Sequence, residues 1–261
     1  MATDELLYRI DGDRAWITFN RPKVRNAVTW AMYRRLEEFC DQAEADESIR
    51  VVLLRGAGGQ AFVAGTDISQ FANFRTEQDP LDYEHRIDRI VGRVESLAKP
   101  TIALLEGYCV GGGAAIALAC DFRYATPELQ FGIPIARTLG NCLSMANIAR
   151  MVELLGPART KEALMLAKLL DADTARQVGL VTEVFPPESI QSEVEAVADW
   201  LASLAPLTLR AIKEAVHRTQ VQRRVAPEDG HDLILSCYMS EDFREGVKAF
   251  TEKRRPVWRG R

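Results

Sequence analysis

The sequence predicts an α/β fold in which a mixed core precedes a helical C-terminal region. Short apolar runs at residues 51–54 and 101–105 have the length of strands buried on both faces. Segments with apolar residues at helical spacing separate these runs, and from Pro187 onward the pattern is wholly helical. We therefore expect an α/β core over residues 1–195 and a C-terminal helical region over residues 196–261.

The composition indicates a soluble globular protein. The chain has 261 residues, 47% of them apolar and 27% charged, with a net charge of −4. This charge argues against nucleic acid and anionic membranes as partners, and the longest apolar runs are too short to span a bilayer. We expect neither partner.

Cysteine and histidine usage gives further expectations. The five cysteines are scattered without a Cys-x-x-Cys pair, and the acidic N-terminus does not resemble a secretory signal, so we expect a reduced, cytoplasmic protein. The three histidines lie far apart in the sequence, so we expect no metal site.

The first half of the chain alternates strands and helices. Residues 6–10 and 15–20 predict two strands joined by a turn, and Thr29 is a plausible N-cap for the helix that follows. The polar segment from Arg75 to Glu84 contains Pro80, and we expect it to be a mobile loop. A helix with apolar residues from Ile87 to Leu97 then leads to the strand at 101–105.

The second half continues with two strands, at residues 122–125 and 130–131, and a helix over 144–155. One more strand is expected at 180–184. Helical stripes at 190–204 and 243–250 belong to the C-terminal region.

Two glycine-containing corners are the most informative features. Residues 62–67 (FVAGTD) and 110–115 (VGGGAA) each place glycine where an apolar strand ends and a helix begins. Such corners direct backbone N–H groups into a cavity, and a helix dipole adds positive potential behind them. Two facing corners can hold one thioester oxygen between two donors, which is an oxyanion hole made of main chain.

Four separated motifs occur in an order typical of one family. They are residues 20–27 (NRPKVRNA), 62–68, 106–113 and 250–254 (FTEKR). With these motifs the chain resembles the crotonase superfamily, the enoyl-CoA hydratase/isomerase fold, over nearly its whole length. The resemblance implies a spiral of ββα units and a C-terminal helical region that assembles trimers and often hexamers.

The resemblance also implies chemistry on an acyl-CoA thioester, whose enolate is stabilised by the backbone N–H groups of Thr66 and Gly112. Coenzyme A is then part of the substrate, and no separate cofactor is expected. The loop at Arg21 and the following residues would contact coenzyme A. The implied substrate-binding residues are Lys23, Val24, Ala64, Asp67, Ile68, Ser69, Ala115, Ile135, Phe250 and Lys253. Two of these also have structural interpretations: for Asp67 a helix N-cap is the plainer role, and for Lys253 a solvated basic end is an equal alternative.

The two glutamates that hold water in the hydratases of this family are missing. One would stand at Ala115, and the other at Ile135, or at Ala136 if one residue is inserted before Gly140. A positioned acid or base contributes about 10²–10⁴ in rate, and methyl and butyl groups move no protons. Ordinary hydratase activity is therefore not expected.

Candidate replacements come from two segments. Asn141 or Ser144 would position a water, and Cys142 would act as a nucleophile if its thiolate were stabilised, although a helix cap is the plainer role for Asn141 and Ser144. Asp82, Glu84 and His85 lie on the expected loop, and His85 is the candidate base. Glu106 should end a strand and Asp121 should begin one.

The sequence leaves three hypotheses. The first is an acyl-CoA enzyme of the enoyl-CoA hydratase/isomerase type that stabilises an enolate without the hydratase glutamates. The second is another reaction of the same enolate: isomerisation, C–C cleavage, thioester hydrolysis or dehalogenation. The third is a non-catalytic acyl-CoA-binding protein.

Overall fold

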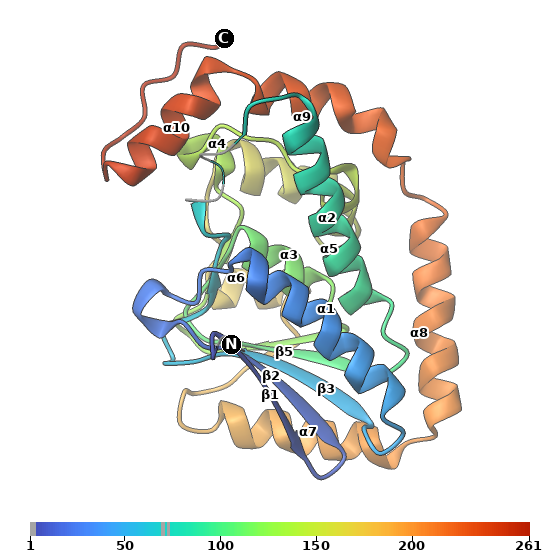
Figure 1. The fold of residues 1–261 in the computed structure, drawn as a ribbon. Coiled ribbons are helices and arrows are strands. Elements are labelled where there is room, and N and C mark those ends of the chain that lie inside the picture. Colours follow the sequence, from blue (N-terminus) through green and yellow to red (C-terminus); the bar gives the residue numbers. More distant parts are fainter. Residues whose placement is uncertain (1–3, 69–70, 72–73) are drawn as a thin grey trace.

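The computed structural model describes residues 4–68, 71 and 74–261, and its core is a spiral that builds two sheets (Figure 1). The larger sheet has the order β1 (Leu6–Asp11), β2 (Arg14–Phe19), β3 (Val51–Gly56), β5 (Thr101–Leu105), β7 (Phe122–Ala125) and β9 (Glu183–Val184). The smaller sheet has the order β4 (Ala61–Ala64), β6 (Tyr108–Val110) and β8 (Gln130–Gly132). Among the named strands of the described residues, β1 and β2 pair antiparallel and the others pair parallel, and successive turns add one strand to each sheet.

Helices follow the strand pairs and form the C-terminal region. The core helices are α1 (Trp30–Ala45), α2 (Gln78–Glu95), α3 (Gly112–Leu118), α4 (Ile135–Thr138), α5 (Met145–Met165) and α6 (Ala172–Gln177). The later helices are α7 (Ile190–Ser203), α8 (Pro206–Val221), α9 (His231–Tyr238) and α10 (Glu241–Thr251). The described residues also form the 3₁₀ helices η1 (Pro22–Val24) and η3 (Pro227–Gly230). The expected ββα spiral with a helical C-terminal region is confirmed.

Both faces of the larger sheet are covered. Val51 and Leu53 of β3 pack in one cluster with Val194 and other residues of α7. Val52 and Leu54, which point the other way because side chains alternate along a strand, join the main core with α1 and α3. Figure 1 shows α7 on one side of this sheet and α1 on the other. Because both faces are covered, these strands appear in the sequence as continuous apolar runs.

The prediction of a loop from Arg75 to Glu84 was wrong, because α2 begins at Gln78. Two features allow the early start. Pro80 lies in the first turn, where its missing N–H costs no helical hydrogen bond. The carboxylate of Asp79 accepts hydrogen bonds from the backbone N–H groups of Arg75 (2.7 Å) and Thr76 (2.6 Å). Glu84 is consequently a buried helical residue, whereas Asp82 and His85 on the same helix are exposed.

The chain after the sheet wraps around the core. The expected boundary between residues 195 and 196 falls inside α7, whose buried residues Val194 and Ala198 lie on either side of it. Figure 1 shows α8 along one flank and α9 and α10 at the end opposite α7. In the described parts of the chain, no helix is long and apolar enough to cross a membrane.

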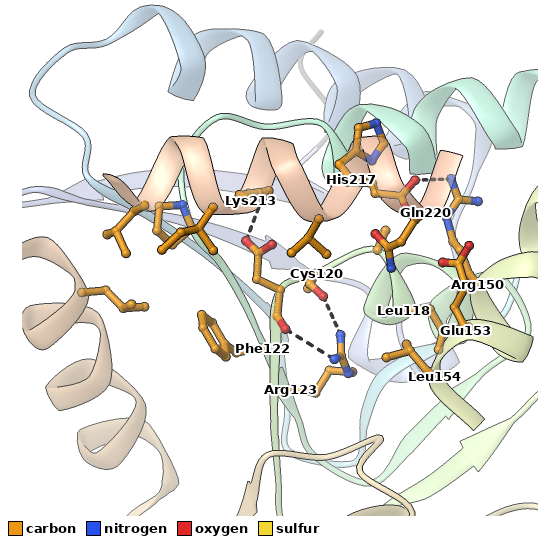
Figure 2. Close-up of a pocket in the computed structure, with 18 residues that line it drawn as sticks. Leu118, Cys120, Phe122, Arg123, Arg150, Glu153, Leu154, Lys213, His217 and Gln220 are labelled. Carbon is orange, nitrogen blue, oxygen red and sulfur yellow. Dashed lines mark hydrogen bonds and ion pairs between the residues drawn. The ribbon is translucent and has the colours of Figure 1, made fainter. Parts of the chain in front are cut away.

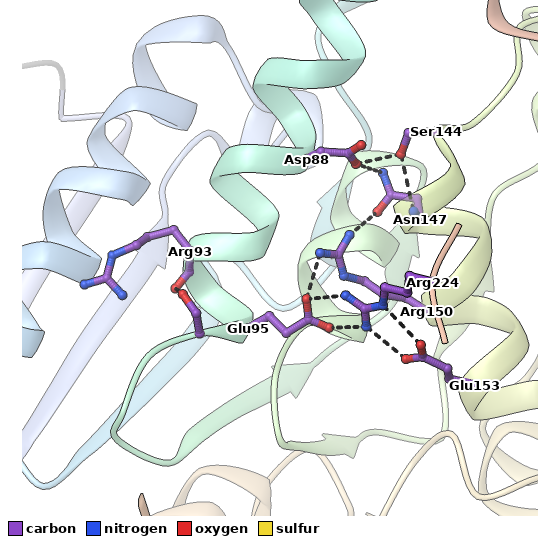
Figure 3. A network of polar contacts seen from close by, with 9 residues as sticks. Asp88, Arg93, Glu95, Ser144, Asn147, Arg150, Glu153 and Arg224 are labelled. Carbon is purple, nitrogen blue, oxygen red and sulfur yellow. Dashed lines mark hydrogen bonds and ion pairs between the residues drawn. The ribbon is translucent and has the colours of Figure 1, made fainter. Parts of the chain in front are cut away.

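A buried ion-pair network anchors the segment after α8 to the core (Figure 3). The Glu95 carboxylate, at the end of α2, accepts from Arg150 of α5 at 2.8 Å and from both terminal nitrogens of Arg224 at 2.7 and 2.8 Å. Arg224 also pairs with Glu153 at 2.9 Å. Burial alone would raise the pKa of Glu95, but the hydrogen bonds and charges of the two arginines outweigh it and lower the pKa to about 2.

Glu95→Gln is expected to lower the free energy of unfolding by about 3–5 kcal/mol at neutral pH, because it leaves buried guanidinium groups without their carboxylate. The folded pKa of Glu95 lies below the ordinary 4.5, so its contribution is present above pH 4.5 and is lost as the pH falls toward about 2. Denaturant unfolding between pH 7 and pH 3 measures both effects. The matched control is Glu162→Gln, since the exposed Glu162–Arg159 pair should contribute less than about 1 kcal/mol. Equal losses in the two variants would contradict the prediction.

Candidate active site

A cavity of about 650 Å³ opens where the smaller sheet meets α2, α3 and α10. The ends of β4 and β6, the first turn of α3 and the Pro22–Val24 loop supply its polar rim, while α2, α4 and the segment before α5 supply apolar walls. Of the sequence-predicted site residues it collects Lys23, Val24, Ala64, Thr66, Asp67, Ile68, Gly112, Ala115, Ile135 and Phe250.

Two predicted residues are not part of this set. Lys253 follows α10 with an exposed side chain and a φ of 54°, and it does not line the cavity. Ser69 lies outside the described residues. Asp67 lines the rim and pairs with Arg21 at 3.2 Å, so Arg21 holds the corner in place rather than lining the cavity.

The two glycine corners lie side by side because β4 and β6 are neighbouring parallel strands. Ala64 pairs with Val110, so the residues that follow, Gly65 and Gly111, leave the sheet at the same level. Both glycines have positive φ, 94° and 57°, which other residues rarely adopt. A side chain on Gly111 would also begin 3.3 Å from the Cα atom of Gly65.

The next residue of each corner, Thr66 in one and Gly112 in the other, lines the cavity. Within the described residues, neither Thr66 nor Gly112 donates its N–H to a main-chain carbonyl, and Gly112 opens α3, where the helix has no acceptor for it. A Cβ atom on Gly112 would lie 3.6 Å from the Thr66 nitrogen. Two unpaired donors thus lie close to each other at the cavity, an arrangement that would suit an oxygen that gains negative charge.

Two glycines of the 111–113 run are required for different reasons. A Cβ on Gly112 would come within 2.3 Å of the Tyr33 hydroxyl, so only glycine leaves this position open. A Cβ on Gly113 would lie 2.3 Å from the Val63 carbonyl oxygen, so this glycine permits α3 to pack on β4.

A cluster of hydroxyl groups lies beside these donors, and sequence analysis missed it. The Thr66 hydroxyl hydrogen-bonds to the hydroxyls of Tyr33 (2.9 Å) and Tyr83 (3.4 Å). Burial raises the pKa of Tyr33 to about 12, so the hydroxyl stays protonated. Tyr33 continues the apolar stripe of α1 at helical spacing from Leu36 and Cys40, and that spacing is the signal that could have identified it.

No carboxylate stands at the two positions where the resemblance places the hydratase glutamates. Ala115 and Ile135 both line the cavity, whereas Ala136 is exposed. Ile133 and Leu143 extend the same apolar wall.

One carboxyl group nevertheless reaches the cavity from α2. Glu84 is 4% exposed, and its two oxygens accept hydrogen bonds from the Tyr238 hydroxyl (2.5 Å) and the Ser144 N–H (3.2 Å). Burial raises the pKa of Glu84 to about 8, and the neighbouring carboxyl of Asp88 adds to the shift.

The other candidates from the sequence, Ser144, Cys142 and Asn141, make contacts that suit structural roles. Ser144 caps α5 by accepting from the Asn147 N–H, and its hydroxyl donates to Asp88 at 2.6 Å. A hydrogen bond with Cys237 and burial raise the pKa of Cys142, which disfavours a nucleophilic thiolate. Asn141 lines the cavity and donates to the Tyr238 hydroxyl.

A second cavity, of about 310 Å³, lies between α8 and the start of β7 (Figure 2). Asp121 pairs there with Lys213 at 2.7 Å, and Arg123 donates to the carbonyl oxygens of Ala117, Cys120 and Leu180. None of the sequence-predicted binding residues lines it. Across the described part of the chain, no group of three or more His, Cys, Asp or Glu side chains could hold a metal ion.

Comparison with known proteins identifies the family. The family model described as enoyl-CoA hydratase/isomerase matches residues 11–261. A short-chain-enoyl-CoA hydratase from Clostridium acetobutylicum is 30% identical over 256 residues, covering 98% of this chain and 97% of that protein. The chain therefore belongs to the enoyl-CoA hydratase/isomerase family, and the resemblance to the crotonase superfamily is confirmed.

Solved structures agree with this assignment. An enoyl-CoA hydratase/isomerase from Xanthobacter autotrophicus is similar with a TM-score of 0.85 and 28% identity, over 96% of this chain and 97% of that one. A methylmalonyl-CoA decarboxylase in complex with 2-nitronate-propionyl-CoA is similar with a TM-score of 0.90 and 25% identity, over the full length of both chains.

The free energy of unfolding is expected to fall as the pH rises, because Glu84 loses its proton, and Glu84→Gln is expected to remove this fall. The folded pKa of about 8 lies above the ordinary 4.5, so the protonated group favours folding fully below pH 4.5, and this contribution is lost as the pH rises through about 8. Relative to the unmodified protein, the variant should gain in free energy of unfolding between about pH 5 and pH 9, measured by denaturant unfolding. Asp82→Asn, an exposed change on the same helix, should show no such gain. A parallel pH dependence of the Glu84 variant and the unmodified protein would refute the assignment.

Proposed function

We propose that this protein binds an acyl-CoA thioester and stabilises its enolate between the N–H groups of Thr66 and Gly112. The observation that carries the proposal is the pair of unpaired donors at the mouth of an apolar cavity. Removing one donor of such a hole typically costs about 10²–10³ in rate, so the pair can supply much of the catalysis. The family of the chain supports the thioester as the group that is bound.

The coenzyme A portion is proposed to lie along the rim near η1. Lys23 supplies a cation for phosphate groups, and the exposed apolar side chains of Val24 (49%) and Phe250 (53%) offer contacts for the adenine ring. Asn26 supports this loop: it is fully buried and donates to the carbonyl oxygens of Ala57 and Ala61. Ser69 and Lys253 remain proposed contacts from the resemblance. Coenzyme A enters as part of the substrate, without a separate cofactor.

The reaction is proposed to be an enolate reaction other than ordinary hydration, because Ala115 and Ile135 line the cavity in place of acids. C–C cleavage is a second candidate, favoured by the similarity to the methylmalonyl-CoA decarboxylase structure. Loss of CO₂ leaves its electron pair on the α-carbon, so that step needs an oxyanion hole and no base. Release of CO₂ from methylmalonyl-CoA tests it. Binding without any reaction would leave a non-catalytic acyl-CoA-binding protein.

A homotrimer or hexamer in the cytoplasm is also proposed, without nucleic acid or membrane as a partner. The support is α8, none of whose residues is buried and whose Leu207, Ile212 and Val216 side chains are more than half exposed. The five cysteines are free thiols, which fits a reducing compartment. Light scattering of the purified protein tests the oligomer.

Gly112→Ala is expected to slow enolate formation by about 10²–10³, because the new methyl group would collide with the hydroxyls of Tyr33 and Thr66 and would occupy space beside the Thr66 donor. Exchange of the α-protons of butyryl-CoA for deuterium, followed by mass spectrometry, measures the rate. Gly92→Ala is the matched control, since a Cβ there meets Arg150 at an ordinary 3.8 Å inside α2. An unimpaired Gly112 variant would argue against the oxyanion hole.

Hydration of crotonyl-CoA is expected to be at least about 10²-fold slower than with the Clostridium acetobutylicum hydratase assayed in parallel, because both positioned acids are missing. Calorimetry with butyryl-CoA should nevertheless detect binding. Hydration at the rate of the relative would overturn this prediction.

A further inference from the structure

Glu84 differs from the other acidic residue of the cavity wall in the charge of its partners. Among the described lining residues only Asp67 and Glu84 carry carboxyl groups. Asp67 is paired with the guanidinium of Arg21, whereas the structure gives Glu84 only neutral hydrogen-bond donors. Glu84 is therefore the lining carboxyl group that is available to exchange a proton.

Glu84 lines the cavity from α2, the helix that also contributes Tyr83. The preceding residue, Tyr83, has its hydroxyl 3.4 Å from the Thr66 hydroxyl, beside the proposed oxyanion hole. Ile87, one turn further on, lines the cavity together with Leu143. Along α2, Glu84 thus lies between a residue that contacts the carbonyl-binding corner and a residue of the apolar wall.

The hydrogen bonds of Glu84 fix the orientation of its carboxyl group and leave some of its lone pairs without a donor. Asn141 donates to the Tyr238 hydroxyl at 3.0 Å, so the single proton of Tyr238 is directed to one Glu84 oxygen. The Ser144 N–H, at the cap of α5, occupies the other oxygen. Each carboxylate oxygen accepts two hydrogen bonds, so each keeps one lone pair for a proton from the cavity.

We infer that Glu84 is the proton-transfer residue of this site and serves double-bond isomerisation of an apolar enoyl-CoA, an inference that rests on the proposed function. The Glu84 carboxylate takes a proton from the α-carbon of a 3-enoyl thioester. The C–H electron pair forms the dienolate, whose oxygen accepts from Thr66 and Gly112. The same carboxyl group returns the proton to the γ-carbon, giving the 2-enoyl thioester. One carboxyl group suffices, because the proton gained equals the proton returned.

The pH dependence follows from the groups that face Glu84. These are Tyr33, Tyr83, Tyr238, Cys142 and Asp88. Burial contributes to raised pKa values at the three tyrosines and at Cys142, so they stay neutral. Asp88 is the one neighbouring carboxyl group, and its charge raises the pKa of Glu84. Abstraction of the proton needs the carboxylate, so its rate should rise with pH through a midpoint near 8.

The experiment measures α-deuterium exchange of butyryl-CoA at subsaturating concentration from pH 6 to pH 9, with binding followed by calorimetry. Glu84→Gln should retain binding and reduce exchange by about 10²–10⁴. Asp82→Asn, exposed two residues earlier, should leave exchange unchanged. Asp88→Asn should retain exchange with its midpoint moved to lower pH, which a merely structural role of Glu84 would not produce. Unmodified protein should also convert 3-hexenoyl-CoA to 2-hexenoyl-CoA.

The outcomes separate the two proposals. Exchange that persists in Glu84→Gln, or a midpoint that Asp88→Asn leaves in place, overturns the role of Glu84 while the enolate site stands. Exchange by the unmodified protein without conversion of 3-hexenoyl-CoA overturns the isomerisation. Binding of butyryl-CoA without exchange also overturns the role of Glu84. Failure of the unmodified protein to bind butyryl-CoA overturns the proposed function, and the inference with it.

Discussion

The pairing of Ala64 with Val110 is the constraint on which the site depends. This register places two positive-φ glycines at the same level of neighbouring parallel strands, and the residues that follow them, Thr66 and Gly112, line the same cavity. A shift by one residue would move a donor by about 3.3 Å and turn it toward the other face. The surrounding core holds that register, because β3, β5 and β7 of the larger sheet are buried on both faces.

The features that were predictable from sequence are those in which local pattern and tertiary structure agree. The strand at Thr101–Leu105 has the bounds that its apolar run predicts, and Thr29 caps α1 as expected. The second glycine corner was also predictable, since the end of β6, a glycine and the start of α3 are all visible in a short window, whereas the helix expected after the first corner falls partly outside the described residues. The mutual approach of the two corners follows once the strands are parallel neighbours.

What the sequence could not predict depends on distant partners. Glu84 belongs to a polar segment with a proline, and local pattern therefore indicated a loop. Its burial depends on Tyr238, which is 154 residues away in the chain, and on Ser144. His85, the next residue, was the better candidate by residue type but is exposed. A one-residue difference on a helix rotates a side chain by about 100°, and only the packing of α2 decides which of the two faces the cavity.

The route of the chain around the core has a consequence for biosynthesis. Both strands of the glycine corners are complete by residue 110, and the first turn of α3 follows at once. Tyr238 and Phe250, in contrast, come from α9 and α10 near the end of the chain. A ribosome therefore releases the donors well before the residues that complete the cavity wall. A chain that has not yet folded α9 lacks the Tyr238 partner of Glu84, so the environment that raises the pKa of this carboxyl group requires α9 to be in place.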